Sequence, residues 1–243
     1  MLHLALLVPA ASCLAAFASE PLLLPAHDLR RLAVYATADS DFGGETAQSE
    51  YVSRDASDVP FLPWGASDDL TATAQSAQGQ GRGVFDSVIA PTVLTASGAI
   101  YGRGTIFDET GYAASGGAIA EMRIGLTLTA PTRWHVIASL EATGNASASA
   151  TIFGGLTADA PVLHAWTANY STLSVDAFVT LAPGEYVISF TAEGTASIFY
   201  PPEVVVEASF SGSFRMVPGP GTCVAGIVGV AFALRRKRSP TRM

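Results

Sequence analysis

The sequence is poor in charge, in lysine and in cysteine. Only 14% of its 243 residues are charged, against about a quarter in an average protein. Lys237 is the single lysine, so the residues before it offer none for Schiff-base chemistry or for a phosphate-binding loop. Cys13 and Cys223 lie in the two terminal hydrophobic segments. The region between them therefore has no disulfide, thiolate zinc site or cysteine nucleophile.

The charges that are present are segregated along the chain. All 21 acidic residues lie between Glu20 and Glu207, and five of the 13 basic residues follow residue 234. Eight arginines against 21 acids give the region between the two ends a formal charge of −13. Because such a region repels phosphate backbones, we expect no nucleic-acid partner.

The N-terminus has the pattern of a secretion signal. An apolar run ends in small residues, and Ala16 and Ala18 fit the small-x-small rule of signal peptidase. We therefore predict a signal peptide over 1–18, cleaved before Ser19. A buried N-terminal helix, or a lipoprotein signal that uses Cys13, are the alternatives.

The C-terminus has three parts in a fixed order. Val217, Pro218, Gly219 and Pro220 begin a stretch that breaks regular structure. The apolar segment 222–234 follows, and as a helix it spans roughly 20 Å, less than the ~30 Å hydrocarbon core of a bilayer. The segment is followed by a basic cluster that favours the cytoplasmic side of a membrane. The cluster consists of Arg235, Arg236, Lys237 and Arg238.

This tail resembles the PEP-CTERM sorting tail, which combines a Pro-Glu-Pro motif, a short hydrophobic helix and an Arg-rich end. Here Gly219 stands in the place of the glutamate. The resemblance covers about Val217 to Arg238 of a predicted tail over 217–243, and it implies recognition by an exosortase-type processing enzyme after transient insertion in the inner membrane. An ordinary tail anchor is the alternative.

The body, residues 19–216, shows a periodicity of two, which predicts an all-β fold, an antiparallel β-sandwich or jelly roll. Tyr186, Ile188 and Phe190 share one face of a predicted strand. The polar stretch 39–83 predicts a long loop region that includes Gly79, Gly81 and Gly83. Strands are expected over 32–36, 84–90, 99–107, 119–130, 134–140, 146–153, 173–181, 184–192, 195–200 and 204–216.

Few residues of the body suggest a site. Asp39, Asp41 and Glu45 alternate around glycines and offer the oxygen ligands that calcium prefers, although acids in a solvated loop give the same pattern. Trp134 and Trp166 are candidates for stacking on a glycan, and core packing is the alternative for both. His135 is the candidate base of a hydrolase, but no nucleophile-elbow motif accompanies it.

These observations favour an exported cell-surface or extracellular-matrix protein of a bacterium, without catalytic activity or cofactor. Its expected partners are signal peptidase, the exosortase-type enzyme, the inner membrane for a short time, and exopolysaccharide. A carbohydrate-binding jelly-roll module with structural calcium is the alternative, and a secreted hydrolase ranks last.

Overall fold

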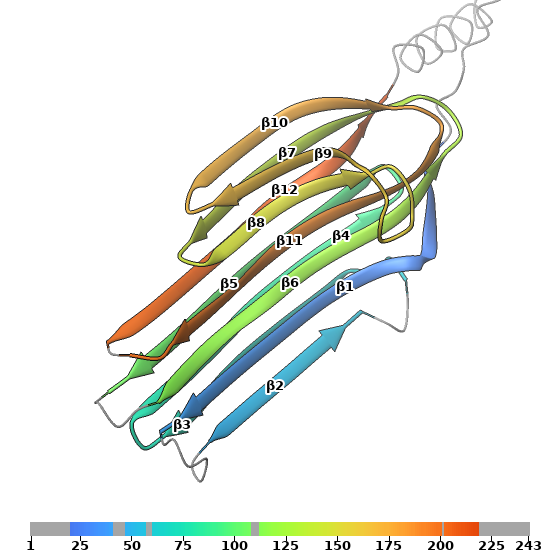
Figure 1. Cartoon of the computed structure of the whole chain (residues 1–243). Coiled ribbons are helices and arrows are strands. Elements are labelled where there is room, and N and C mark those ends of the chain that lie inside the picture. The colour runs from blue at the N-terminus through green and yellow to red at the C-terminus, as the bar shows by residue number, and fades with distance from the viewer. Residues whose placement is uncertain (1–19, 41–46, 57–59, 108–111, 201, 219–243) are drawn as a thin grey trace, which may run out of the picture. The chain divides into compact units, whose positions relative to one another are not determined.

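The computed structural model describes residues 20–40, 47–56, 60–107, 112–200 and 202–218, and all regular structure in them is β-strand (Figure 1). The strands within these ranges are β1 Leu22–Asp39, β2 Gln48–Asp55, β3 Trp64–Ala74, β4 Ala77–Ala90, β5 Val93–Ile106, β6 Ala113–Leu128, β7 Thr132–Thr143, β8 Ala146–Phe153, β9 Val162–Asn169, β10 Thr172–Leu181, β11 Gly184–Ile198 and β12 Glu203–Val217.

The described strands form two antiparallel sheets that pack face to face as a β-sandwich. Sheet A has the order β2-β1-β6-β11-β8-β9, and sheet B has the order β10-β7-β12-β5-β4-β3. In Figure 1 sheet A lies toward the viewer, and the strands of both sheets run along the same long direction. With 14 residues in β5, this direction measures roughly 45 Å. The predicted all-β antiparallel fold is confirmed.

One half of the sandwich has a thick core built from large side chains. Phe190 on β11 stacks on Phe210 of β12, with ring centroids 5.5 Å apart, and Phe214 packs against Phe190 at 5.1 Å. Trp134 and Leu126 are completely buried in the same cluster. Tyr186, Ile188 and Phe190 are all buried, which confirms their predicted common face.

The other half has a thin core of glycine and alanine. A Cβ atom at Gly79 would overlap the carbonyl oxygens of Ser115 and Thr37 in the opposite sheet, and one at Gly116 would overlap that of Gln80. Sheets usually pack about 10 Å apart, and only residues without side chains allow backbones to approach more closely.

This thin core explains why the predicted loop over 39–83 is wrong. The described part of that stretch contains β2, β3 and the first half of β4. Gly79, Gly81 and Gly83 alternate with outward-facing residues on β4 and lie on its buried face. The alternation of a strand is present in this stretch. Its inward positions hold glycine and alanine, however, and a prediction from hydrophobic periodicity recognises only larger apolar residues there. β2 is an edge strand with mostly exposed polar side chains.

A charged pair is buried between the sheets near the start of β1. The register of β1 against β6 shifts between Leu23 and Asp28, and after this bulge the side chain of Arg30 points inward. Its guanidinium donates to both carboxylate oxygens of Asp28, at 2.7 and 2.8 Å. Arg30 also donates to the Leu62 carbonyl, at 2.5 Å, and Asp28 accepts from the Phe61 amide, at 2.7 Å. This network fixes the connection between β2 and β3 to sheet A.

Candidate functional site

The two tryptophans predicted to stack on a glycan have different environments. Trp134 is 0% exposed and belongs to the core, so its proposed contact with a glycan is wrong. The sequence around Trp134 agrees with this burial. Trp134 and His135 point to opposite faces of β7, and the face that carries His135 is mostly polar. Trp166 on β9 is half-buried, packs against the edge of the core and stacks on His164 with ring centroids 5.9 Å apart.

His135 lies on the outer face of sheet B, as a strand residue at the surface. Its Nε2 is 2.6 Å from Asp176 Oδ1 on β10, and its ring stacks on Phe178 with centroids 4.3 Å apart. The Arg133 guanidinium lies 4.2 Å from the centre of the same phenylalanine ring. Within the described residues the hydrogen bonds of His135 include no hydroxyl group, so a Ser-His-Asp arrangement is not assembled there.

The predicted calcium ligands are only partly described. Asp39 is the last residue of β1, and its backbone carbonyl accepts from the Tyr112 amide at 3.1 Å. Asp41 and Glu45 lie outside the described residues. In the part of the chain that the structure covers, no three His, Cys, Asp or Glu side chains gather into a metal site.

The terminal predictions lie mostly outside the described residues. Val217 ends β12 and Pro218 follows it, whereas Gly219 and Pro220 are not described. The same holds for the signal segment with Ala16, Ala18 and Ser19, and for the apolar segment 222–234 with its basic cluster. Among the residues with a described structure, no helix is long and apolar enough to cross a membrane.

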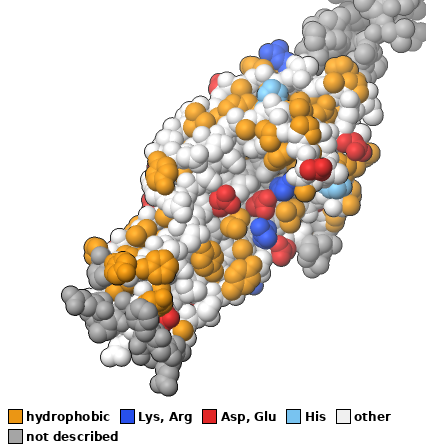
Figure 2. Space-filling view, viewed as in Figure 1, with side chains coloured by type: hydrophobic (Ala, Val, Ile, Leu, Met, Phe, Trp, Pro, Cys, Tyr) orange, Lys and Arg blue, Asp and Glu red, His pale blue; other side chains and the backbone are white. Residues whose placement is uncertain are grey.

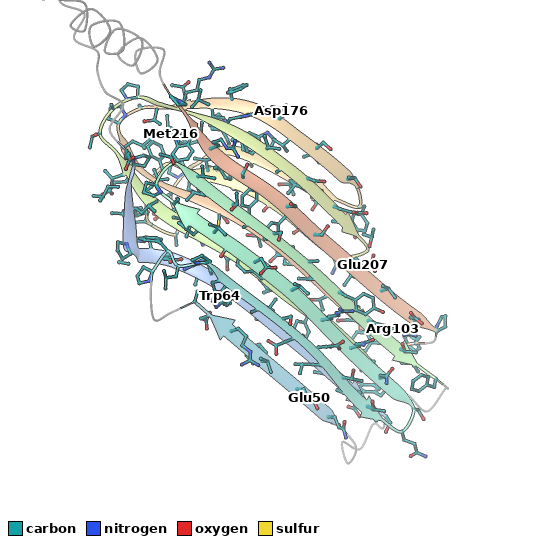
Figure 3. All side chains as sticks on the ribbon, turned by 180° about the vertical axis from the view of Figure 1, so that it is seen from behind. Glu50, Trp64, Arg103, Asp176, Glu207 and Met216 are labelled. Atoms are coloured by element: carbon teal, nitrogen blue, oxygen red, sulfur yellow. The ribbon has the colours of Figure 1, made fainter. Side chains whose placement is uncertain are left out.

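The outer face of sheet B carries a furrow along β5 and β12. One cavity in this furrow has a volume of about 540 Å³ and is lined by one polar rung of the sheet: Arg82, Tyr101, Glu207 and Thr143 are aligned by the registers of β4, β5, β12 and β7. Figure 3 labels Glu207 on β12 and Arg103 on the neighbouring β5, both on this side of the molecule. Arg103 donates to Glu203 at 2.9 Å, and this hydrogen bond raises the pKa of the guanidinium.

The outer face of sheet A carries a second cavity, of about 490 Å³, which we call the sheet-A groove. It lies over β1, β6, β11 and β8 and reaches the corner between β9 and β10. Viewed from this side, the middle of the molecule shows uncharged polar side chains and backbone together with a group of acidic and basic side chains, and hydrophobic side chains are frequent toward both ends (Figure 2). The side chains at its rim are Tyr35, Tyr170, Asn145, Asn169, Glu193 and Thr195.

The residues of the sheet-A groove are far apart in the sequence. The sheet order puts β1 on one side of β6 and β11 on the other, so Tyr35 reaches across β6 to Thr195. Sequence reasoning missed Tyr35, Tyr170, Asn145, Asn169 and Glu193 as a group. No local pattern brings them together, because only the strand order does so.

The comparisons with known proteins found no match: no protein-family model matches the chain, and no curated protein does. The function has to be argued from its own residues.

Proposed function

We propose that this chain is an exported cell-surface or matrix protein without catalytic activity, sorted by its C-terminal tail. One observation supports the proposal above all: the boundaries of the folded unit. The described strands run from Leu22 to Val217. The first strand therefore begins a few residues after the predicted cleavage site, and the last strand ends directly before Pro218, where the sorting motif continues.

The physical argument concerns the order of the parts. β12 continues to Val217 without a linker, so a processing enzyme that cuts near Pro218 releases the complete sandwich. The 13-residue apolar segment 222–234 is too short to hold a bilayer firmly. The cations after it keep the tail end on the cytoplasmic side. Such a segment holds the protein at the inner membrane for a short time and presents the motif on the outer side.

Intact-mass measurement of the mature protein from cells that express an exosortase-type enzyme tests this proposal. We expect a mass that begins at Ser19 and ends near Pro218. A matched strain without the processing enzyme should accumulate the form that retains the basic cluster. A mature protein that keeps Arg235–Arg238 in both strains would contradict the sorting proposal. It would indicate that the tail is a permanent membrane anchor.

Carbohydrate binding by the sandwich, as in a jelly-roll module, is the second candidate function. What favours it is that both outer faces carry cavities in which tyrosine rings stand beside amide, carboxylate or hydroxyl groups. Polysaccharides bind to such surfaces through ring stacking and side-chain hydrogen bonds. Native electrophoresis in gels with and without soluble polysaccharide tests it: retarded migration supports binding, and equal migration in all gels contradicts it.

A further inference from the structure

The sheet-A groove has one wall that is held rigidly. The Tyr35 hydroxyl is hydrogen-bonded to the Thr195 hydroxyl across β6. The ring crosses β6 at Gly117, where a Cβ atom would lie only 2.6 Å from the tyrosine oxygen. Glycine at this position lets the ring lie against the sheet, and the hydrogen bond fixes its orientation. A ligand that stacks on this ring therefore does not have to order it first.

The opposite wall is held by an unusual backbone conformation. Tyr170 has φ +54°, in the left-handed region that bulky residues avoid. Its side chain is 72% exposed, so burial in the core does not compensate for this strain. Strained residues of this kind gather at functional sites. The effect of the conformation is to place a second tyrosine at the corner between β9 and β10, at the edge of the groove.

The polar groups of the groove suit a ligand rich in hydroxyl groups. Asn145 and Asn169 offer exposed amides that both donate and accept, and the Glu193 carboxylate accepts. Ser147 donates to this carboxylate at 3.4 Å. Beneath them, the backbone of β11 is paired with β6 on one side and β8 on the other. Recognition therefore depends on side chains rather than on free backbone groups.

The charge of the groove narrows the ligand class further. Glu193 is the single charged residue of its lining. With one carboxylate and no cation, the lining repels uronates, sulfates and phosphates. A neutral sugar fits, because its hydroxyl groups both donate and accept and its ring has an apolar face.

We propose that the sheet-A groove binds a neutral glycan. Tyr35 and Tyr170 contact the apolar faces of its sugar rings, while Asn145, Asn169 and Glu193 bind its hydroxyl groups. This inference rests on the carbohydrate-binding candidate described above and gives it a site. It is independent of how the tail is processed.

Affinity electrophoresis of the full chain in mild detergent tests the site, with soluble β-glucan and galactomannan as neutral probes and alginate as the anionic probe. Tyr170→Asn removes the ring and keeps a residue that tolerates positive φ. We expect this variant and Glu193→Gln each to weaken binding to the retained neutral probe about tenfold. Tyr200→Asn, which removes an 81% exposed tyrosine outside the groove, should bind like the wild type.

The outcomes separate the site from the function. If the groove variants bind normally and Tyr101→Ser in the sheet-B furrow loses binding, the groove assignment is wrong and carbohydrate binding stands. Retardation by alginate equal to that by the neutral probes overturns the charge argument and with it the proposal. If neither neutral probe retards the wild type, the glycan proposal fails. The sorting proposal is unaffected by that outcome, because the intact-mass measurement tests it separately.

Discussion

Arg30 and Asp28 form a bidentate ion pair inside the sandwich, with side-chain exposures of 0% and 2%. Both charges are desolvated, so the removal of either side chain leaves the other buried without a counter-ion. The pair also binds the Leu62 carbonyl and the Phe61 amide. Its loss therefore affects the chain that leads from sheet A to sheet B.

Asp28→Asn should destabilise the protein by about 3–5 kcal/mol, because it leaves the Arg30 charge buried without a counter-ion. Denaturant unfolding followed by circular dichroism measures the change. Glu203→Gln is the control: it removes the partner of Arg103 at the surface, where each side chain is more than a third exposed, and should cost no more than about 1 kcal/mol. Equal effects of the two substitutions would argue against a buried, mutually dependent pair.

Gly116→Ala should be severely destabilising, because the added methyl group meets the backbone of Gln80 in the opposite sheet. Overpacking a core costs about 1–3 kcal/mol, and here the obstacle is a main chain that cannot rotate away. Gly154→Ala provides the comparison, since its nearest neighbour is the movable side chain of Leu163, 3.1 Å away. Thermal melting of both variants would show a large loss for the first and a small one for the second.

Trp134→Ala should cost about 3–5 kcal/mol of unfolding free energy through the cavity that it leaves. Trp166→Ala should cost less, because that side chain is only half-buried. Trp134→Phe deserves a separate measurement, since the buried Trp134 Nε1 has no hydrogen-bond partner among the described residues. Removing this unsatisfied group should offset part of the lost packing. A Trp134→Phe variant as unstable as the alanine variant would contradict this expectation.

Tyr186→Phe should destabilise the protein by about 1 kcal/mol while leaving the fold intact. The Tyr186 hydroxyl donates to the Ala182 carbonyl at 2.8 Å and closes the connection between β10 and β11. The buried ring is retained, so only this hydrogen bond is removed. Chemical denaturation at equal protein concentration measures the difference. An unchanged midpoint would mean that water replaces the bond.

The sequence was informative where inward positions carry large apolar residues. The expected strand 119–130 corresponds to the second half of β6, and the inward set of Tyr186, Ile188 and Phe190 is found in β11. It failed at β2 and β3, because an exposed edge strand and a thin core lack the hydrophobic alternation on which the prediction depends. The sequence also did not predict that Arg30 points inward. This orientation follows the bulge after Leu23, and it depends on the carboxylate of Asp28, two residues earlier, as a buried partner.

The candidate site was less predictable than the fold for a similar reason. Tyr35 and Thr195 are 160 residues apart, and they meet because β1, β6 and β11 are neighbours in sheet A. Strand order follows from the packing of the whole chain and has no local signature. The left-handed conformation of Tyr170 is also invisible in a sequence, because nothing distinguishes this tyrosine from one in a regular strand.

The position of β12 has a mechanical consequence. β12 lies between β7 and β5 and is hydrogen-bonded to both along most of its length. A force applied at Val217 acts along the strand. It therefore loads the hydrogen bonds to β5 and β7 in shear, all at the same time, whereas a force across an edge strand breaks them one after another. A protein tethered through this end would resist steady traction far better than one tethered through an edge strand.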